Sequence, residues 1–292
     1  MPLNDTHCHF FSTPFFSALG GEAALNTLGW DSPGTSDDLA DRWVAELDRH
    51  GVSRAALIAS MPGDSVSVGD AVRRHPSRFV GFFMVDPTQA TAAVSTAYAI
   101  DRDKLRTICL YPVMHRFSLH DEGVRRVIDV AAARPGTCVF VHCGVLSVGV
   151  RKKLGLPSPF DIHFSNPVDL QAIALAYPSA TFIVPHFGAG CFREALMLAD
   201  LCPNVVLDTS SSNGWVKYHP GLTLAGVFRQ ALAVVGPDRL LFGTDSSFFP
   251  RGWVANVYTE QSSALDEIGA SAEAREKIFG GTFDRLFSVA ST

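Results

Sequence analysis

The first β-rich run of the chain, with the aromatic residue that follows it, reads Leu3-Asn4-Asp5-Thr6-His7-Cys8-His9-Phe10. The run predicts a strand over residues 3–9, because apolar and β-branched residues outnumber turn formers there. In an open, doubly wound sheet the turn after the first strand carries a G-x-G-x-x-G phosphate loop. Here the corresponding position reads Thr6-His7-Cys8-His9-Phe10 and contains no such loop. The stretch therefore argues against a dinucleotide-binding sheet and favours the other large parallel architecture, the barrel.

Seven further β-rich runs follow at intervals that leave room for a helix between each pair. Helical spacing is clear in stretches such as Leu39, Trp43 and Leu47, and glycines or prolines mark the joints. Several strands are apolar almost throughout, as parallel strands covered on both faces are. We therefore predict an α/β protein, a (β/α)8 TIM barrel of eight parallel strands. The predicted strands cover residues 3–9, 54–60, 78–85, 105–111, 137–143, 181–186, 204–209 and 239–245.

The bulk composition is that of one globular domain. Of the 292 residues 47% are hydrophobic and 18% are charged, and a single α/β barrel typically needs about 250 residues. We expect one domain over residues 1–292. A net charge of −5 with short, scattered basic clusters predicts no nucleic-acid partner. With no apolar run of about 20 residues and no signal-peptide pattern, we expect no membrane partner and a cytoplasmic location. Six cysteines without a CxxC pair predict reduced, buried thiols.

Five side chains able to bind a metal stand at or near the ends of predicted strands. His7 and His9 are two residues apart, so both imidazoles project from one face of the strand. Two imidazoles in an apolar core are costly without a polar partner, and a shared cation supplies one. His142, His186 and Asp245 end three other apolar runs. Because the carboxyl ends of barrel strands meet at one mouth, these residues predict a site for Zn²⁺, Mn²⁺ or Co²⁺.

Three predicted connections after strands are long, and all three belong on the rim that carries the active site of a barrel. They cover residues 10–35, 144–166 and 210–221. The first holds four phenylalanines and Trp30 and predicts an apolar wall or lid. Further candidates to contact a substrate are Tyr111, Arg151 and the polar run of residues 210–213. For each of them packing, solvation or a turn is the alternative role. His163 lies in the second loop, which can fold over the site.

These residues resemble a known family. Asp5-Thr6-His7-Cys8-His9, the two strand-end histidines and Phe242-Gly243-Thr244-Asp245 are similar to the amidohydrolase superfamily. The most similar branch is the amidohydrolase 2 group, which includes aminocarboxymuconate semialdehyde decarboxylase, aromatic-acid decarboxylases and lactonases. The resemblance extends over nearly the full length to a C-terminal closing helix near Ile278-Phe279-Gly280-Gly281, although Thr282 stands where the family usually has Asn. Family members are often dimers, so the resemblance implies a possible homodimer.

The resemblance also implies a ligand set. Its pattern makes His7, His9, His142 and Asp245 the ligands of one Zn²⁺ per chain, with His186 and Asp245 as the catalytic acid/base groups. Binuclear relatives use a lysine at the end of strand four, and residues 107–111 contain none. We therefore expect a single metal ion.

This set of groups can perform two reactions on a small-molecule substrate. A zinc ion lowers the pKa of bound water to about 7, which suits hydrolysis of a lactone, ester or amide. Asp245 then accepts the water proton and His186 polarises a carbonyl or protonates the leaving group. The alternative is non-oxidative decarboxylation of an aromatic or muconate-like acid. This chain lacks the Pro after the strand-five histidine and the His-x-Gly-Glu motif typical of those decarboxylases, which favours hydrolysis. A barrel that keeps a structural metal or a bound ligand but has no turnover is a third alternative.

Overall fold

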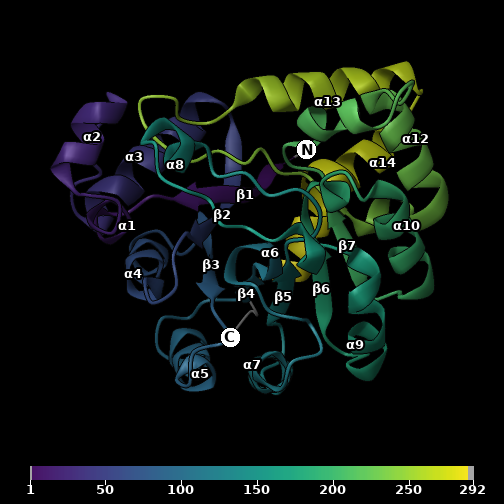
Figure 1. Ribbon diagram of the computed structural model, residues 1–292. Coiled ribbons are helices and arrows are strands. Elements are labelled where there is room, and N and C mark those ends of the chain that lie inside the picture. The colour runs from purple at the N-terminus through teal and green to yellow at the C-terminus, as the bar shows by residue number, and fades with distance from the viewer. Residues whose placement is uncertain (1, 289–292) are drawn as a thin grey trace.

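The computed structural model describes residues 2–288, apart from the side chains of residues 212 and 213. Residues 1 and 289–292 of the predicted domain therefore lie outside the described part. Eight parallel strands form one sheet in the order β1 to β8, and helices surround them (Figure 1). The strands are β1 (Leu3–Phe10), β2 (Val52–Ala59), β3 (Phe79–Val85), β4 (Thr107–Leu110), β5 (Cys138–Val141), β6 (Thr181–Val184), β7 (Val205–Asp208) and β8 (Leu240–Leu241). Each overlaps one predicted run, so the predicted TIM barrel is confirmed.

The barrel is closed by the chain segment that follows β8. The backbone amide of Thr6 donates to Phe242 O at 2.9 Å, and that of His9 donates to Ser246 O at 2.7 Å. In return the amide of Asp245 donates to His7 O at 2.9 Å. The end of β8 is thereby fixed beside β1, which brings Asp245 to the two histidines of the first strand.

The helices pack outside the strands and on the two ends of the barrel. They are α1 (Thr13–Ser17), α2 (Glu22–Leu28), α3 (Ser36–Arg49), α4 (Ser65–Arg74), α5 (Ala92–Asp101), α6 (Pro112–His115), α7 (Glu122–Ala132), α8 (Gly149–Lys153), α9 (Gln171–Ala176), α10 (Phe192–Leu201), α11 (Ser212–Trp215), α12 (Leu224–Val235), α13 (Ala255–Glu267), α14 (Ala272–Glu276) and α15 (Thr282–Phe287). No helix in the part of the chain that the structure describes is long and apolar enough to cross a membrane.

Alternate residues of each strand enter two different hydrophobic layers. In β5, Val139 and Val141 belong to the layer between strands and helices, whereas Phe140 belongs to the barrel interior. In β1, Cys8 lies in the outer layer. Because side chains alternate along a strand, His7, His9 and His142 take the interior positions. The cysteines beside these histidines therefore turn away from the mouth, as predicted, and all six cysteines are free thiols.

The amino end of the barrel is closed by the C-terminal helix, as the family resemblance implied. Phe283 and Phe287 of α15 are buried and belong to the interior cluster. Asp284 accepts hydrogen bonds from Asn4 Nδ2 and Arg54 Nη1, both at 3.0 Å. We call these five residues the base. A short π-helix (Lys277–Gly281) joins α14 to α15, and Thr282 is buried in this junction.

The three long loops lie on the opposite end and fold into short helices. Residues 10–35 contain α1 and α2, residues 144–166 contain α8, and residues 210–221 contain α11. Helix α8 lies near α1 and α2 (Figure 1), and Val150 of α8 packs with Phe15 and Phe16 of α1. The predicted apolar wall is therefore present, and the β5 loop completes it.

Candidate active site

The two histidines of β1 are held so that one ring nitrogen of each is free to bind a ligand. His7 Nδ1 donates to Asp208 Oδ2 at 2.7 Å, and both side chains are buried. His9 Nδ1 lies 2.8 Å from Ser60 Oγ, whose own hydrogen goes to Ile58 O at 2.9 Å. Ser60 must therefore accept from His9 Nδ1. When each ring is neutral, Nε2 is the unprotonated nitrogen. Burial lowers the pKa of His7, but Asp208, Asp245 and Asp5 outweigh burial and raise that pKa overall.

Asp245 faces both of these nitrogens. Its Oδ1 lies 3.3 Å from His9 Nε2 and 3.7 Å from His7 Nε2. Burial raises the pKa of Asp245, but the adjacent His9 side chain and the other nearby histidines outweigh burial and hold that pKa well below its usual range. The residue adopts a left-handed backbone, with φ of 62°. Such a conformation is costly outside glycine and is typical of functional sites.

His186 reaches the same mouth through an unusual backbone. Strand alternation after Ile183, which lies in the interior, would place residue 186 outside. Instead His186 and Phe187 have φ of 56° and 50°, and His186 lines the pocket with its ring centroid 4.9 Å from that of His7. Its Nδ1 donates to Ser210 O at 2.8 Å, which leaves Nε2 as the acceptor. Burial lowers the pKa of His186.

His142 and Tyr111 form the far side of this group. Their rings stack with centroids 5.4 Å apart, and the His142 ring lies 5.2 Å from that of His186. Burial lowers the pKa of His142 well below its usual value and raises that of Tyr111. Neither His142 Nδ1 nor the Tyr111 hydroxyl has a hydrogen-bond partner among the described residues. Both side chains line the cavity, so these two atoms are available to a ligand bound there.

Two supporting residues, Asp208 and Ser210, were not assigned these roles from the sequence. Asp208 ends β7, and strand alternation after Val206 of the interior cluster places it inside. The sequence did contain a sign of this role, because Asp208 is an acidic residue at the end of an apolar strand, just as Asp245 is an acidic residue after β8. Ser210, predicted to contact substrate or form a turn, is buried, with Oγ 3.0 Å from His7 Nδ1 and 2.9 Å from His186 Nδ1. It links the two histidines; the side chains of residues 212 and 213 lie outside the described set.

Close packing leaves no space for a larger residue at Gly243. A Cβ there would lie 2.9 Å from Asp208 Oδ1 and 2.9 Å from His7 Cβ. Asp5 anchors the same region from below, because its carboxylate accepts from the amides of His7 at 2.8 Å and Thr244 at 3.1 Å. The Trp253 indole also donates to Asp5, at 2.7 Å. These contacts fix β1 against the end of β8.

The donor set fits a divalent cation. One ligand atom each from His7, His9 and Asp245 lie within 4.8 Å of one another. His9 Nε2 and Asp245 Oδ1 are both acceptors, so their approach is unfavourable unless a proton or a cation lies between them, and burial lowers the pKa of His9. His7 Nε2 is likewise buried without a partner. Imidazole and carboxylate ligands suit Zn²⁺ and its neighbours, and the hydrogen bond from His7 to Asp208 is the support that such ligands usually have. The predicted ligand His142 is not part of this trio; it lines the same cavity, with its ring 5.2 Å from that of His186.

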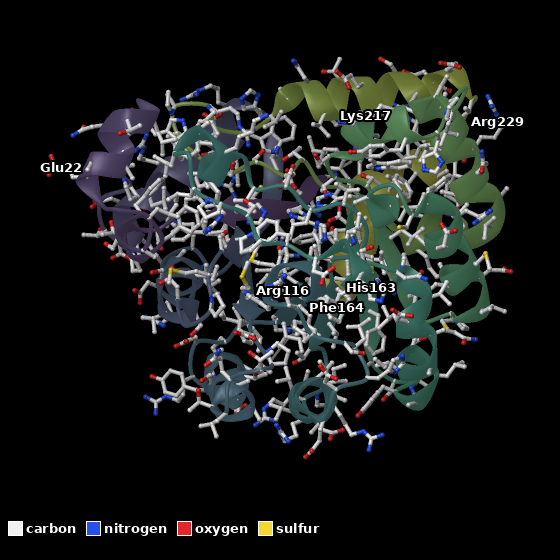
Figure 2. All side chains as sticks on the ribbon, viewed as in Figure 1. Glu22, Arg116, His163, Phe164, Lys217 and Arg229 are labelled. Carbon is white, nitrogen blue, oxygen red and sulfur yellow. The ribbon has the colours of Figure 1, made fainter. Side chains whose placement is uncertain are left out.

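A cavity of about 600 Å³ opens over these residues, a size suited to a small molecule. Phe11, Phe15 and Trp30 of the wall line it, and so does Tyr111. Arg151 does not line it: Arg151 Nε donates to Pro157 O at 2.9 Å. The cationic side chains that do line it were not predicted: Lys153, Lys217 and Arg251. His163, labelled in Figure 2, is exposed, belongs to a short helix (Ile162–Phe164) and does not line the cavity.

Comparison with curated proteins gives one partial match. The chain is 37% identical over 93 residues to Protein fluG of Emericella nidulans. That match covers 32% of this chain and 10% of the relative, so the chain aligns with about a tenth of that longer protein.

Solved structures show the same fold over nearly the whole chain at low identity. A 5-carboxyvanillate decarboxylase from Novosphingobium aromaticivorans with bound manganese has a TM-score of 0.65 at 16% identity, covering 99% of this chain and 97% of that one. A probable 2-pyrone-4,6-dicarboxylic acid hydrolase from Acinetobacter baumannii has a TM-score of 0.63 at 16% identity, covering 99% and 100%. An amidohydrolase from Burkholderia multivorans with bound zinc has a TM-score of 0.59 at 18% identity, covering 98% and 99%.

The family comparison covers far more of the sequence than the curated relative does. The model described as Amidohydrolase matches residues 5–289, from the first histidine strand to the closing helix. The chain belongs to the amidohydrolase family.

Proposed function

We propose that this chain is a metal-dependent hydrolase that cleaves a small lactone, ester or amide at one divalent ion. In this proposal His7, His9, His142 and Asp245 hold the ion, which is Zn²⁺, with Mn²⁺ or Co²⁺ as replacements. The observation that carries it is that Nε2 of His9 and Nε2 of His7 face one oxygen of Asp245, at 3.3 and 3.7 Å. The structural relatives with bound zinc and bound manganese support it.

The bound ion would supply Lewis acidity, which favours negative charge on oxygen and lowers the pKa of water. Asp245, held ionised by the histidines around it, is the group able to accept a proton from an attacking water. His186 enters the reaction neutral, with Nε2 as an acceptor because Nδ1 is engaged by Ser210 O. It therefore donates to a leaving group only after it has gained a proton. The Tyr111 hydroxyl, which stays protonated, can donate to a substrate oxygen.

Decarboxylation of a small aromatic or muconate-like acid is the second candidate. Its support is the structural similarity to a 5-carboxyvanillate decarboxylase, together with cationic groups at the pocket that suit a carboxylic acid. In that reaction His186 would first take a proton from water at Nε2 and then deliver it to the carbon that loses CO₂. Product analysis separates the reactions: acid release from lactones without CO₂ supports the hydrolase, and CO₂ release from hydroxybenzoates supports the decarboxylase.

Elemental analysis of the purified protein tests the metal site. We expect about one ion per chain in the wild type and little in His7→Ala. Asp245→Asn should lose activity in either reaction. His163→Ala is the matched control, because that histidine is exposed and outside the cavity lining. Metal content that is unchanged in His7→Ala would refute the ligand assignment.

A further inference from the structure

The cavity lining carries more cationic than acidic side chains. Lys153, Lys217 and Arg251 line it, and none of them forms an ion pair with a carboxylate among residues 2–288. Asp245 is the one acidic group among the described lining residues, and it faces the histidines. Elsewhere many cations are paired, such as Arg74 with Asp41 and Arg134 with Asp101. The uncompensated cations at the cavity are therefore available to an anionic ligand.

Two of these cations are held around a single aromatic ring. Lys153 Nζ lies 5.6 Å from the centroid of Phe248, and Arg251 Cζ lies 4.7 Å from the same centroid. The Phe248 ring stacks on Trp30 at 3.6 Å, and Lys153 also lies 5.3 Å from the Trp30 ring. Two like charges beside one ring repel each other, and cation–π contact relieves this only in part. An anion beside the pair would stabilise it.

The elements that carry this group are themselves held in place. Trp30 comes from the β1 loop, Lys153 from α8 and Phe248 and Arg251 from the segment after β8. Val150, one turn before Lys153, is buried against the wall. Arg251 Nη2 donates to Ser247 Oγ at 2.7 Å and to Asp245 O at 3.2 Å. The Arg251 head is therefore close to the residue whose carboxylate faces His7 and His9.

We infer that the substrate carries two anionic or metal-seeking ends, and that Lys153 and Arg251 bind the end remote from the reacting group. This inference rests on the proposed function, because it places the reacting end at the His7, His9 and Asp245 cluster. The contact from Arg251 to the backbone of Asp245 keeps the two subsites close, so the ligand is a small one. A ring or short chain with two carboxylates has the two anionic ends and the small size that these subsites require. Lys153 is then a specificity-determining residue, selecting a dianion over a monoanion.

Calorimetric titration with two probes tests the inference. The probes are benzoate and isophthalate (benzene-1,3-dicarboxylate), which share a ring and differ by one carboxylate. For the wild type we expect isophthalate to bind roughly tenfold more tightly at low salt, since each partly exposed charge pair contributes a modest amount. In Lys153→Gln the preference should fall to about threefold or less, and in Lys153→Arg it should return. Lys152→Gln is the matched control, because Lys152 adjoins Lys153 but does not line the cavity.

Equal binding of the two probes by the wild type would overturn the inference, and so would an equal loss of preference in Lys152→Gln and Lys153→Gln. The titrations are run on zinc-loaded and chelator-treated protein. A wrong metal assignment would show as benzoate affinity that does not respond to zinc. The ratio of the affinities for the two probes, measured on the same sample, reports the contribution of Lys153 independently of the metal.

Discussion

The two ends of this barrel differ in how their buried polar groups are paired and in their backbone conformation. At the base, apolar rings fill the interior, and the carboxylate of Asp284 accepts from both Asn4 and Arg54. At the carboxyl end, His7 Nε2, His142 Nδ1 and the Tyr111 hydroxyl are buried without partners, whereas among the five residues of the base only Asn4 Oδ1 is. Left-handed backbone outside glycine is also concentrated there. Of the seven such residues in the described chain, one precedes a strand, and the others are His186, Phe187, Ala189, Ser211, Asp245 and Arg116, all in connections after strands.

The difference shows where stability and function reside. Unpaired polar atoms and left-handed residues each destabilise a fold by about 1–3 kcal/mol, so they persist only where the surroundings hold them. Here the hydrogen bonds of Asp5 and Asp208 and the packing around Gly243 supply that support. We therefore expect changes at the base to alter stability and changes at the carboxyl end to alter binding.

The largest expected effect is at the base. Phe283→Ala removes a buried ring that contacts Phe287 and Arg54, and such truncations cost about 3–5 kcal/mol. Urea unfolding should show this loss, while metal per chain in the folded variant stays at the wild-type value. Phe283→Leu, which keeps most of the volume, should lose much less. Loss of metal from a folded Phe283→Ala variant would show that the two ends are not independent.

Removal of the metal comes next. A ligand present at 100 times its dissociation constant stabilises the folded state by about 2.7 kcal/mol. Chelation should therefore lower Tm, and added Zn²⁺ should restore it. In His7→Ala the same addition should leave Tm unchanged. A zinc-dependent rise in Tm that persists in that variant would place the ion elsewhere.

Loss of the support behind His7 should weaken the metal site without removing it. Asp208→Asn keeps an oxygen near His7 Nδ1 but loses the charge, and changes of this kind weaken metal binding about 10- to 100-fold. Competition with a chromogenic chelator measures the affinity. Asp200→Asn, at an exposed position on α10, serves as the control. Wild-type affinity in Asp208→Asn would mean that the pair only supports packing.

The smallest effect is expected at Tyr111, and it should have opposite signs in two measurements. Tyr111→Phe removes a buried hydroxyl that has no partner, so ligand-free stability should be unchanged or higher by up to about 1 kcal/mol. Affinity for isophthalate should fall, because the site loses a hydrogen-bond donor to this ligand. Tyr98→Phe, on the exposed face of α5, should change neither. Clear destabilisation by Tyr111→Phe would indicate a structural role instead.

Strand periodicity explains why much of the site could be predicted without coordinates. In a strand with period two, the interior positions of β1, β5 and the β8 segment are the ones that hold His7, His9, His142 and Asp245. The same rule places Tyr111 of the β4 run inside, where it lines the cavity. It also applies to Asp208, which could have been identified by extending β7 by its final residue.

Loop positions could not be predicted in that way. Arg151 and Lys153 lie two residues apart in one basic run, and only their backbone path decides that Lys153 lines the cavity while Arg151 binds Pro157 O. His186 is brought to the mouth by left-handed residues that no local pattern specifies.

The sequence by itself therefore determined the parallel barrel, its closing helix and the strand-borne imidazoles and carboxylate, because hydrophobic period and strand alternation are local properties. The tertiary structure alone decided which cations meet Phe248, how His186 turns inward and which polar atoms are left without partners. Those features depend on separate loops meeting over one mouth, and contacts between segments far apart in the chain leave no periodic trace in the sequence.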